Sequence, residues 1–362
     1  MALRIIIILA GFNNHIGNWC ANQLGRMRHC ILDEGGRQVH SGNLITVFGG
    51  SGFIGRSVVR ALAKRGYRIR VAVRRPDLAF HLQPIGNVGQ IHAVQANLRY
   101  PASIKSALEG ADGVVNLCGL LHESGRQTFE GVHVFGAHAI AKAAAEQGIT
   151  KLVHLSALGA DVDSTSDYAR TKAEGAARVR ETVPSATILE PSVVFGQEDN
   201  FFNKFAGLAR MMPVFPLIGG GHTKFQPLYV GDLAKAVVEC LENDEAAGQT
   251  FELGGPEVLS LAEIMEFIFT TIDRKRMTVP LPFAIARFEA QFLKLLPNPI
   301  LTPDQVELLK QDSIVSEQAV LQKRDLGALG IKAHAIEAIV PPYLARFRRA
   351  GQFTQVGHSD QA

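Results

Sequence analysis

Three glycines at three-residue spacing, between a short apolar run and a helical pattern, constrain the fold more than any other sequence feature. Residues 44–48 are apolar and rich in β-branched side chains, as in a buried parallel strand. The helix that begins within the G-x-x-G-x-x-G motif offers free N–H groups to an anion. We expect this strand–turn–helix to bind a pyrophosphate; a glycine-rich turn without a ligand is the alternative. The residues expected to bind it are Gly49, Ser51, Gly52, Phe53, Ile54 and Gly55.

Strand-like runs and helical patterns alternate over the next 150 residues. The apolar runs lie at residues 69–73, 91–94, 113–117, 151–155 and 186–189, and the longest helical pattern at 134–147. Alternation of this kind predicts βαβ units with right-handed crossovers. The expected fold is α/β, a doubly wound parallel sheet of the Rossmann type, with a smaller α/β C-terminal lobe.

The pattern changes after residue 201, which suggests a division of the chain into four parts. We expect an unstructured N-terminal extension (1–42), a nucleotide-binding Rossmann domain (43–200), a lobe for substrate or partner (201–350) and a mobile polar tail (351–362). A helical pattern at 230–241 and a strand-like run at 250–253 fall in the third part.

Composition excludes several classes of protein. With 47% hydrophobic and 20% charged residues the chain can form a large core, and its net charge of +3 is too small to indicate a nucleic-acid partner. The four cysteines have no C-x-x-C spacing, and the histidines have no metal-ligand spacing, so we expect neither a disulfide scaffold nor a metal site. No apolar run approaches the ~18–20 residues needed to span a bilayer.

Two arginines, Arg74 and Arg75, follow the second expected strand. About 20 residues beyond such glycines, a carboxylate would bind the ribose 2′-hydroxyl of NAD. Guanidinium groups instead suit the 2′-phosphate of NADP by charge and geometry. A solvated basic face is the alternative, since six arginines and lysines precede the pair with no acid between them. The sequence therefore favours NADP(H).

Tyr168 and Lys172 lie four residues apart in a predicted helix and so share one of its faces. A lysine there can lower the tyrosine pKa and bind the nicotinamide ribose, and the tyrosine can exchange a proton with a substrate. Ser156 follows the strand at 151–155 and is expected to polarise a substrate oxygen. Its hydroxyl could instead bond backbone, and the equivalent position could fall at Ala157, which has no hydroxyl. Cofactor binding without turnover is the alternative for Tyr168 and Lys172.

Together these motifs resemble the short-chain dehydrogenase/reductase superfamily in its extended or atypical branch. Within it, the chain is similar to the NAD(P)H-binding accessory subunit of mitochondrial complex I and its bacterial homologues, over roughly residues 43–320. The segments that carry the resemblance are 44–55 (LITVFGGSGFIG), 153–160 (VHLSALGA), 168–175 (YARTKAEG), 191–202 (PSVVFGQEDNFF), 226–232 (QPLYVGD) and 301–312 (LTPDQVELLKQD).

The resemblance implies further cofactor contacts and a role beyond ordinary catalysis. The residues it implies are Asn97 and Leu98 near the adenine, Leu117, Cys118 and Gly119 beyond the fourth strand, and Pro191, Val193 and Val194 near the nicotinamide carboxamide. In the mitochondrial relative the nucleotide is thought to be mainly structural and the subunit lies beside the quinone region. A fungal relative is associated with coenzyme Q biosynthesis. Both imply a place at the surface of an inner membrane.

One segment is compatible with that place. In residues 283–296, apolar side chains recur at helical spacing, and Arg287 and Lys294 could face lipid headgroups. A helix packed on its own lobe is the alternative. The apolar residues are Phe283, Ile285, Ala286, Phe288, Phe292, Leu293 and Leu296.

The sequence thus predicts an NADP(H)-binding protein associated with complex I or with ubiquinone metabolism. It would be soluble on the cytoplasmic side or peripheral on the inner membrane. The first alternative is a soluble oxidoreductase, epimerase or dehydratase acting on a sugar nucleotide or small carbonyl compound, which the intact Tyr168–Lys172 pair favours. A second alternative is a sensor that binds NADP(H) without catalysis. The sequence identifies no substrate, because a fold of this kind supports many reactions.

Overall fold

The computed structural model describes residues 30–32, 38–40, 42–294, 299–349 and 351. Near its start, β1 (Cys30–Leu32) and β2 (Gln38–His40) pair antiparallel, with Ile31 opposite Val39. For these six residues the expectation of an unstructured extension is wrong, because short β-branched segments close in sequence can pair with each other. The rest of 1–42, and the expected mobile tail apart from Gly351, lie outside the described residues.

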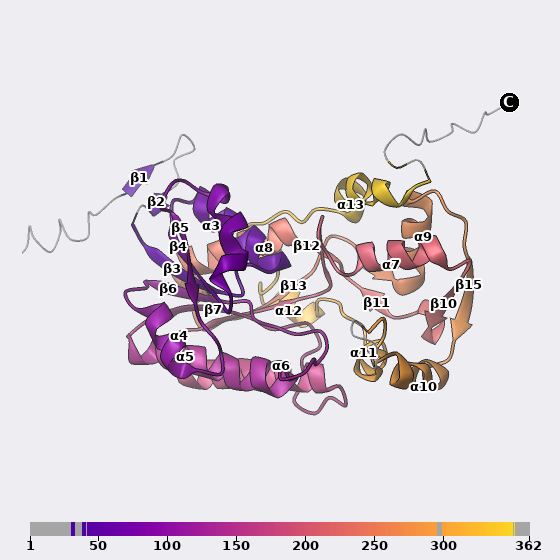
Figure 1. The fold of residues 1–362 in the computed structure, drawn as a ribbon, viewed down its shortest axis with the longest axis horizontal. Helices are drawn as coiled ribbons and strands as arrows, with labels where there is room; N and C mark the ends of the chain where they lie inside the picture. The colour runs from indigo at the N-terminus through magenta and orange to yellow at the C-terminus, as the bar shows by residue number, and fades with distance from the viewer. Residues whose placement is uncertain (1–29, 33–37, 41, 295–298, 350, 352–362) are drawn as a thin grey trace, which may run out of the picture.

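A seven-stranded parallel sheet forms the centre of the first of two lobes, drawn on the left of Figure 1, in the order β13-β8-β7-β6-β3-β4-β5. Its strands are β3 (Leu44–Phe48), β4 (Arg68–Val73), β5 (Ile91–Gln95), β6 (Gly113–Asn116), β7 (Lys151–Leu155), β8 (Thr187–Pro191) and β13 (Thr250–Leu253). The chain runs outward from β3 to β4 and β5, and then from β6 in the opposite direction. The doubly wound fold is therefore confirmed.

Helices cover both faces of this sheet because alternate residues of each strand point to opposite faces. Val47, Val115 and Val153 pack with the face covered by α3 (Phe53–Lys64) and α8 (Val230–Glu242). Val114 and Leu152 pack with the opposite face. The elements on that opposite face are α4 (Pro101–Leu108), α5 (Ala137–Glu146), α6 (Asp167–Thr182) and the π-helical turn η2 (Glu130–Gly136); η1 (Pro76–Ile85) follows β4.

Two segments beyond residue 201 return to the first lobe, which consists of the seven-stranded sheet and the helices that cover it. β13 pairs with β8 in parallel, with Phe251 opposite Leu189, and α8 packs on α3. The expected boundary at residue 200 therefore does not divide the chain into two contiguous parts. The apolar run at 250–253 shows that a strand is present but not which sheet it joins, since that depends on pairing across about 60 residues.

The second lobe has its own core, built by α7 (Phe202–Met211), α9 (Leu261–Thr271) and α13 (Ile336–Leu344). Beside it, β10 (Val214–Ile218) and β15 (Met277–Leu281) pair in parallel, and α10 (Phe283–Leu293) packs on α11 (Pro303–Leu308). The remaining elements are β9 (Val194–Phe195), β11 (Lys224–Phe225), β12 (Leu228–Tyr229), β14 (Leu259–Ser260), α12 (Glu317–Leu321), η3 (Gly219–Gly221), η4 (Asp244–Ala246), η5 (Gly327–Leu329) and η6 (Ala345–Phe347). Across the described residues, no helix is both long and apolar enough to cross a bilayer.

Candidate functional site

The carboxyl ends of the parallel strands bring the expected site residues to one edge of the sheet. The glycine loop follows β3, and the loop of residues 117–119 follows the adjacent β6. A methyl group at Gly49 would lie 3.2 Å from the carbonyl carbon of Leu117, and one at Gly119 would lie 3.3 Å from Nζ of Lys172. These close approaches show that the glycine loop, the 117–119 loop and α6 meet in one place.

The three glycines of the loop serve different purposes. Gly49 has a φ of +79°, which favours glycine, and a methyl group at Gly55 would lie 2.2 Å from the Gly49 carbonyl oxygen. Gly52 has an ordinary φ of −75°, and a methyl group there would meet only the Gly49 oxygen, at 3.4 Å. The fold therefore requires glycine at positions 49 and 55 but leaves open space at position 52.

That open space lies at the amino end of α3, which fits a phosphate group. Among the residues that the structure describes, no side chain caps this helix, and its first turn holds no acidic residue. Its first N–H groups and the positive end of its dipole are thus available to an anion. The side chains of Phe53 and Ile54 are partly buried against protein, Phe53 beside Gly196, so these residues would contact a ligand through their backbone. Ser51 is half-buried in the same turn.

Both arginines after β4 are exposed, but one already has an acidic partner. Arg75 donates to the Asp77 carboxylate over 2.9 Å, and this bond lowers the pKa of Asp77. Asp77 was not among the residues expected at the site, although its position two residues after Arg75 is compatible with an ion pair. An incoming 2′-phosphate would have to compete with Asp77 for Arg75.

Tyr168 lies at the start of α6 and packs against two other rings. Its ring is edge-on to Phe129 and His133, with centroids 6.0 and 5.4 Å away. Burial, and then the nearby Asp304 carboxylate, raise the pKa of Tyr168 to about 12. The expected lowering of this pKa by Lys172 is therefore wrong. Desolvation of the phenolate raises the pKa most, and the unforeseen Asp304 carboxylate raises it further.

Lys172 lies one turn further along α6 and is almost fully buried. Its ammonium donates to the Leu155 carbonyl oxygen at the end of β7, over 2.9 Å. Burial lowers the pKa of Lys172 to about 8. An ammonium group has three donors, so Lys172 can bind the strand end and still donate to a ribose hydroxyl in front of it.

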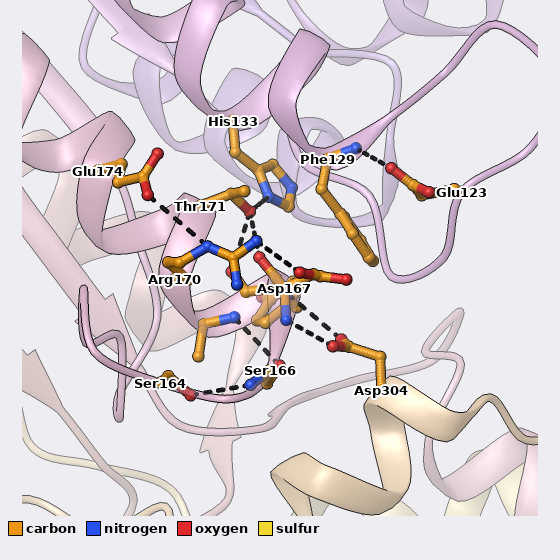
Figure 2. Close-up of polar contacts among 12 residues, drawn as sticks. Glu123, Phe129, His133, Ser164, Ser166, Asp167, Arg170, Thr171, Glu174 and Asp304 are labelled. Atoms are coloured by element: carbon orange, nitrogen blue, oxygen red, sulfur yellow. Dashed lines mark hydrogen bonds and ion pairs between the residues drawn. The ribbon is translucent and has the colours of Figure 1, made fainter.

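His133 links α6 to the loop beyond β6. Its Nε2 accepts from the Leu120 N–H at 3.0 Å. Figure 2 shows its second contact, in which Nδ1 lies 3.0 Å from Oγ1 of Thr171. Burial, and then the charge of Lys172, lower the pKa of His133 to about 3, so the ring is neutral. Gly175 permits this packing, because a methyl group there would lie 2.0 Å from the His133 carbonyl oxygen. No sequence signal indicated this role of His133, because it depends on contacts with Leu120 and Thr171.

His154, in β7, and Ser156, directly after β7, are both buried and polar. Oγ of Ser156 and Nε2 of His154 have no hydrogen-bond partner within the described part of the chain. The backbone-bonded alternative for Ser156 is thus not realised. The other ring nitrogen of His154 lies 3.0 Å from the Asn116 amide, and Asn116 also accepts from the Cys118 N–H. Unsatisfied buried polar atoms are rare, and a bound nucleotide or substrate would explain them.

The other residues expected to contact the cofactor differ in their burial and in their hydrogen bonds. Asn97 accepts from the Arg99 N–H, and the Leu98 side chain packs into the core beside α5. The Pro191 carbonyl accepts from Leu158 N–H at the end of β7, and Val193 is partly buried. Val194 pairs with Leu228 in β9 and β12. Burial raises the pKa of the Cys118 thiol to about 11, so this cysteine is protonated.

The arrangement of this edge agrees with a comparison with known families. Residues 45–254 match the model of the NAD dependent epimerase/dehydratase family. The chain belongs to this family.

The chain is also similar in sequence to subunits of respiratory enzymes. The mitochondrial NADH dehydrogenase (ubiquinone) 1 alpha subcomplex subunit 9 of Arabidopsis thaliana is 36% identical, over 88% of this chain and 81% of the relative. The mitochondrial NADH-ubiquinone oxidoreductase 40 kDa subunit of Neurospora crassa is 32% identical, over 88% and 83%. An NADPH-dependent quinone oxidoreductase of Escherichia coli, solved with NADPH, has a TM-score of 0.65 at 20% identity, over 81% and 97%, which shows a shared fold.

Nucleotide binding to this family member should weaken as the pH rises through 8. A phosphate or ribose oxygen near Lys172 would stabilise its ammonium form and raise its pKa, so binding takes up a proton. The free-state pKa is about 8. Cys118, His133 and His154 stay neutral between pH 7 and 9. We expect NADPH affinity, measured by calorimetry, to fall by up to about tenfold per pH unit above 8. In Lys172→Arg the slope should disappear; an unchanged slope would assign it to another group.

Proposed function

We propose that this chain is an NADP(H)-binding accessory protein of respiratory complex I or of ubiquinone metabolism, in which the nucleotide is mainly structural. The observation that carries the proposal is the extent of the similarity. The Arabidopsis and Neurospora relatives match 88% of the chain, and thus both lobes rather than the nucleotide-binding one alone. A reductase that shared only the nucleotide site would not require likeness in the second lobe.

The residues at the sheet edge fit a dinucleotide in two halves. The α3 N–H groups and the space at Gly52 would hold the pyrophosphate, and Arg74 and Arg75 the 2′-phosphate of the adenine half. Lys172 would donate to the nicotinamide ribose. When bound, NADPH supplies a hydride, and Tyr168 and Ser156 would be the residues to exchange a proton with a substrate or to orient its carbonyl.

The protonation of these residues favours a structural role for the nucleotide. A general acid or base works best with a pKa near the operating pH. The Tyr168 pKa is about 12, and the His133 and His154 pKa values are about 3, so none of the three is matched to neutral pH. Of the site's titratable groups, only Lys172, with a pKa of about 8, is matched to neutral pH, and its ammonium is held by the Leu155 carbonyl oxygen.

The proposal is tested by native electrophoresis of mildly solubilised membranes from the source organism. We expect the protein to migrate with complex I and to carry NADPH. Tyr168→Phe should leave assembly unchanged, because the structural role needs no phenol. Migration of all the protein in the soluble fraction, or loss of function in Tyr168→Phe with normal nucleotide content, would contradict the proposal.

A second candidate is an NADP(H)-dependent oxidoreductase, epimerase or dehydratase. It is favoured by the intact Tyr168–Lys172 pair and by the Ser156 hydroxyl, which has no hydrogen-bond partner among the described residues. Under this alternative, the protein with NADPH should reduce small carbonyl compounds or quinones, and Tyr168→Phe should abolish that turnover. Screening such substrates by the loss of NADPH absorbance separates the two candidates.

The location that we propose is a peripheral site on the inner membrane, on its cytoplasmic side, through α10. Ala286 and Ala290 face the α11 side and are buried, whereas Ile285, Phe288 and Phe292 are exposed. An exposed apolar stripe on a helix suits the interfacial region of a bilayer. The packed-helix alternative thus holds for one face of α10 only. Leu296 lies outside the described residues.

Charge substitutions on that stripe should release the protein from membranes. We expect Phe288→Asp with Phe292→Asp to reduce cosedimentation with anionic phospholipid vesicles at least about fivefold, because an aspartate cannot enter the acyl region. The matched control is Leu78→Asp with Phe80→Asp, which alters equally exposed apolar residues after β4. Equal binding of both variants and the wild type would refute the contact.

A further inference from the structure

A carboxylate from the second lobe closes the amino end of α6. Asp304, on α11, accepts from the backbone N–H of Asp167 at 2.6 Å and of Tyr168 at 3.3 Å (Figure 2). The helix's own cap, Ser166, accepts from the Ala169 N–H. Free N–H groups in the first turn of a helix need acceptors, and here two of them find theirs 136 and 137 residues away.

The hydrogen bonds of Asp304 are made to α6, since α11 is capped by other residues. Thr302 and Gln305 form a reciprocal capping box at the start of α11, with both bonds at 3.2 Å. Asp304 lies between them in sequence, yet its two oxygens reach the other lobe. Its carboxylate is therefore available to act on α6.

We propose that Asp304 is a positioning residue for the nicotinamide half of the nucleotide site. The proposal deepens the proposed function and rests on NADP(H) binding there. Tyr168 is itself one of the two N–H donors, and Lys172 follows one turn later on the same helix. By fixing the first turn of α6, Asp304 sets where both side chains stand relative to the 117–119 loop.

The charge of Asp304 also acts on Tyr168 directly. After burial, the Asp304 carboxylate is the second cause of the high Tyr168 pKa. Burial raises the pKa of Asp304, and hydrogen bonds from Ser166, Asp167 and Tyr168 offset only part of that rise. Asp304 therefore both places the tyrosine and helps to keep it protonated.

The position of Asp304 depends in turn on how α11 is held in the second lobe. Val306 packs with Ala286 and Ala290 of α10, and Glu307 pairs with Arg287 over 3.2 Å. The nicotinamide half of the site is thus completed by the second lobe, whereas the adenine half is built from the first lobe alone. This difference makes the role of Asp304 measurable.

The test compares two ligands on the full chain. In Asp304→Asn we expect NADPH to bind about tenfold more weakly, since a charged acceptor at a helix terminus is lost. Adenosine 2′,5′-bisphosphate, which lacks the nicotinamide half, should bind within about twofold of wild type. Hydrogen exchange at the Asp167 and Tyr168 amides should speed up. Asp304→Glu, which keeps the charge, should recover part of the NADPH affinity.

The controls separate a local effect from general damage. Glu317→Gln removes one exposed carboxylate at the start of α12 and should change neither ligand. Equal losses for both ligands in Asp304→Asn, or unchanged NADPH affinity with unchanged exchange, would overturn the proposal. If the wild type binds no NADPH, the proposed function fails; unchanged exchange in Asp304→Asn would then remove the helix-positioning role as well.

Discussion

A methyl group at residue 52 should abolish tight nucleotide binding while leaving the fold unchanged. The added carbon would touch only the Gly49 oxygen, at 3.4 Å, and Gly52 has a backbone conformation open to alanine. The methyl group would, however, occupy the space where a phosphate approaches the α3 N–H groups. We expect the Kd for NADPH in Gly52→Ala to rise by at least about 100-fold, which corresponds to ~2.7 kcal/mol. Calorimetric titration measures this directly.

Gly55→Ala is the matched control, because it should destabilise the fold itself and not only block the phosphate site. A methyl group there would lie 2.2 Å from the Gly49 oxygen and 2.5 Å from the Gly50 Cα. Backbone must move to admit it, so we expect the free energy of unfolding to fall by about 3 kcal/mol. Gly52→Ala should unfold within about 0.5 kcal/mol of wild type. Normal NADPH affinity in Gly52→Ala would remove the phosphate site from this loop.

Replacement of both Arg74 and Arg75 by alanine should convert a preference for NADPH into indifference. The two guanidinium groups stand beyond β4, where only the 2′-phosphate distinguishes NADPH from NADH. We expect NADPH affinity to fall about 100-fold and NADH affinity less than about threefold. Equal losses for both nucleotides would mean that the pair is only part of a solvated basic face.

A substitution at Asp77 should change NADPH affinity in the opposite direction. It holds the Arg75 guanidinium over 2.9 Å, in competition with a phosphate. Asp77→Asn should therefore strengthen NADPH binding, by about threefold, and leave NADH unchanged, since a weak exposed pair is replaced by a phosphate contact. Weaker NADPH binding in this variant would show that Asp77 orients Arg75 rather than competing for it.

Local pattern was sufficient for much of the fold. The strands from β3 to β8 are short apolar runs whose alternate residues, such as Val114 and Val115, face different helices. Such runs are strands wherever they pair, and the helices between them impose parallel neighbours. The glycine loop was equally readable, because its turn and its close helix packing depend on residues within one short segment.

The site was readable in part. Tyr168 and Lys172 share a helix face by spacing alone, and Ser156 directly follows β7. The sign of the Tyr168 pKa shift was not readable, because burial causes most of it and the second cause, Asp304, approaches from a segment 136 residues away. His133 was missed for the same reason, since its importance lies in its contacts with Leu120 and Thr171.

The sequence by itself determined the nucleotide loop, the strands and the face shared by Tyr168 and Lys172. These depend on backbone preferences and on periodicities of two or 3.6 residues, which act over a few neighbours. Tertiary structure alone decided that β13 joins the first sheet and that Asp304 closes α6. It also decided that burial would place the pKa values of Tyr168, His133 and Lys172 where they are. Those outcomes depend on which distant surfaces exclude water together, and no local pattern encodes that pairing.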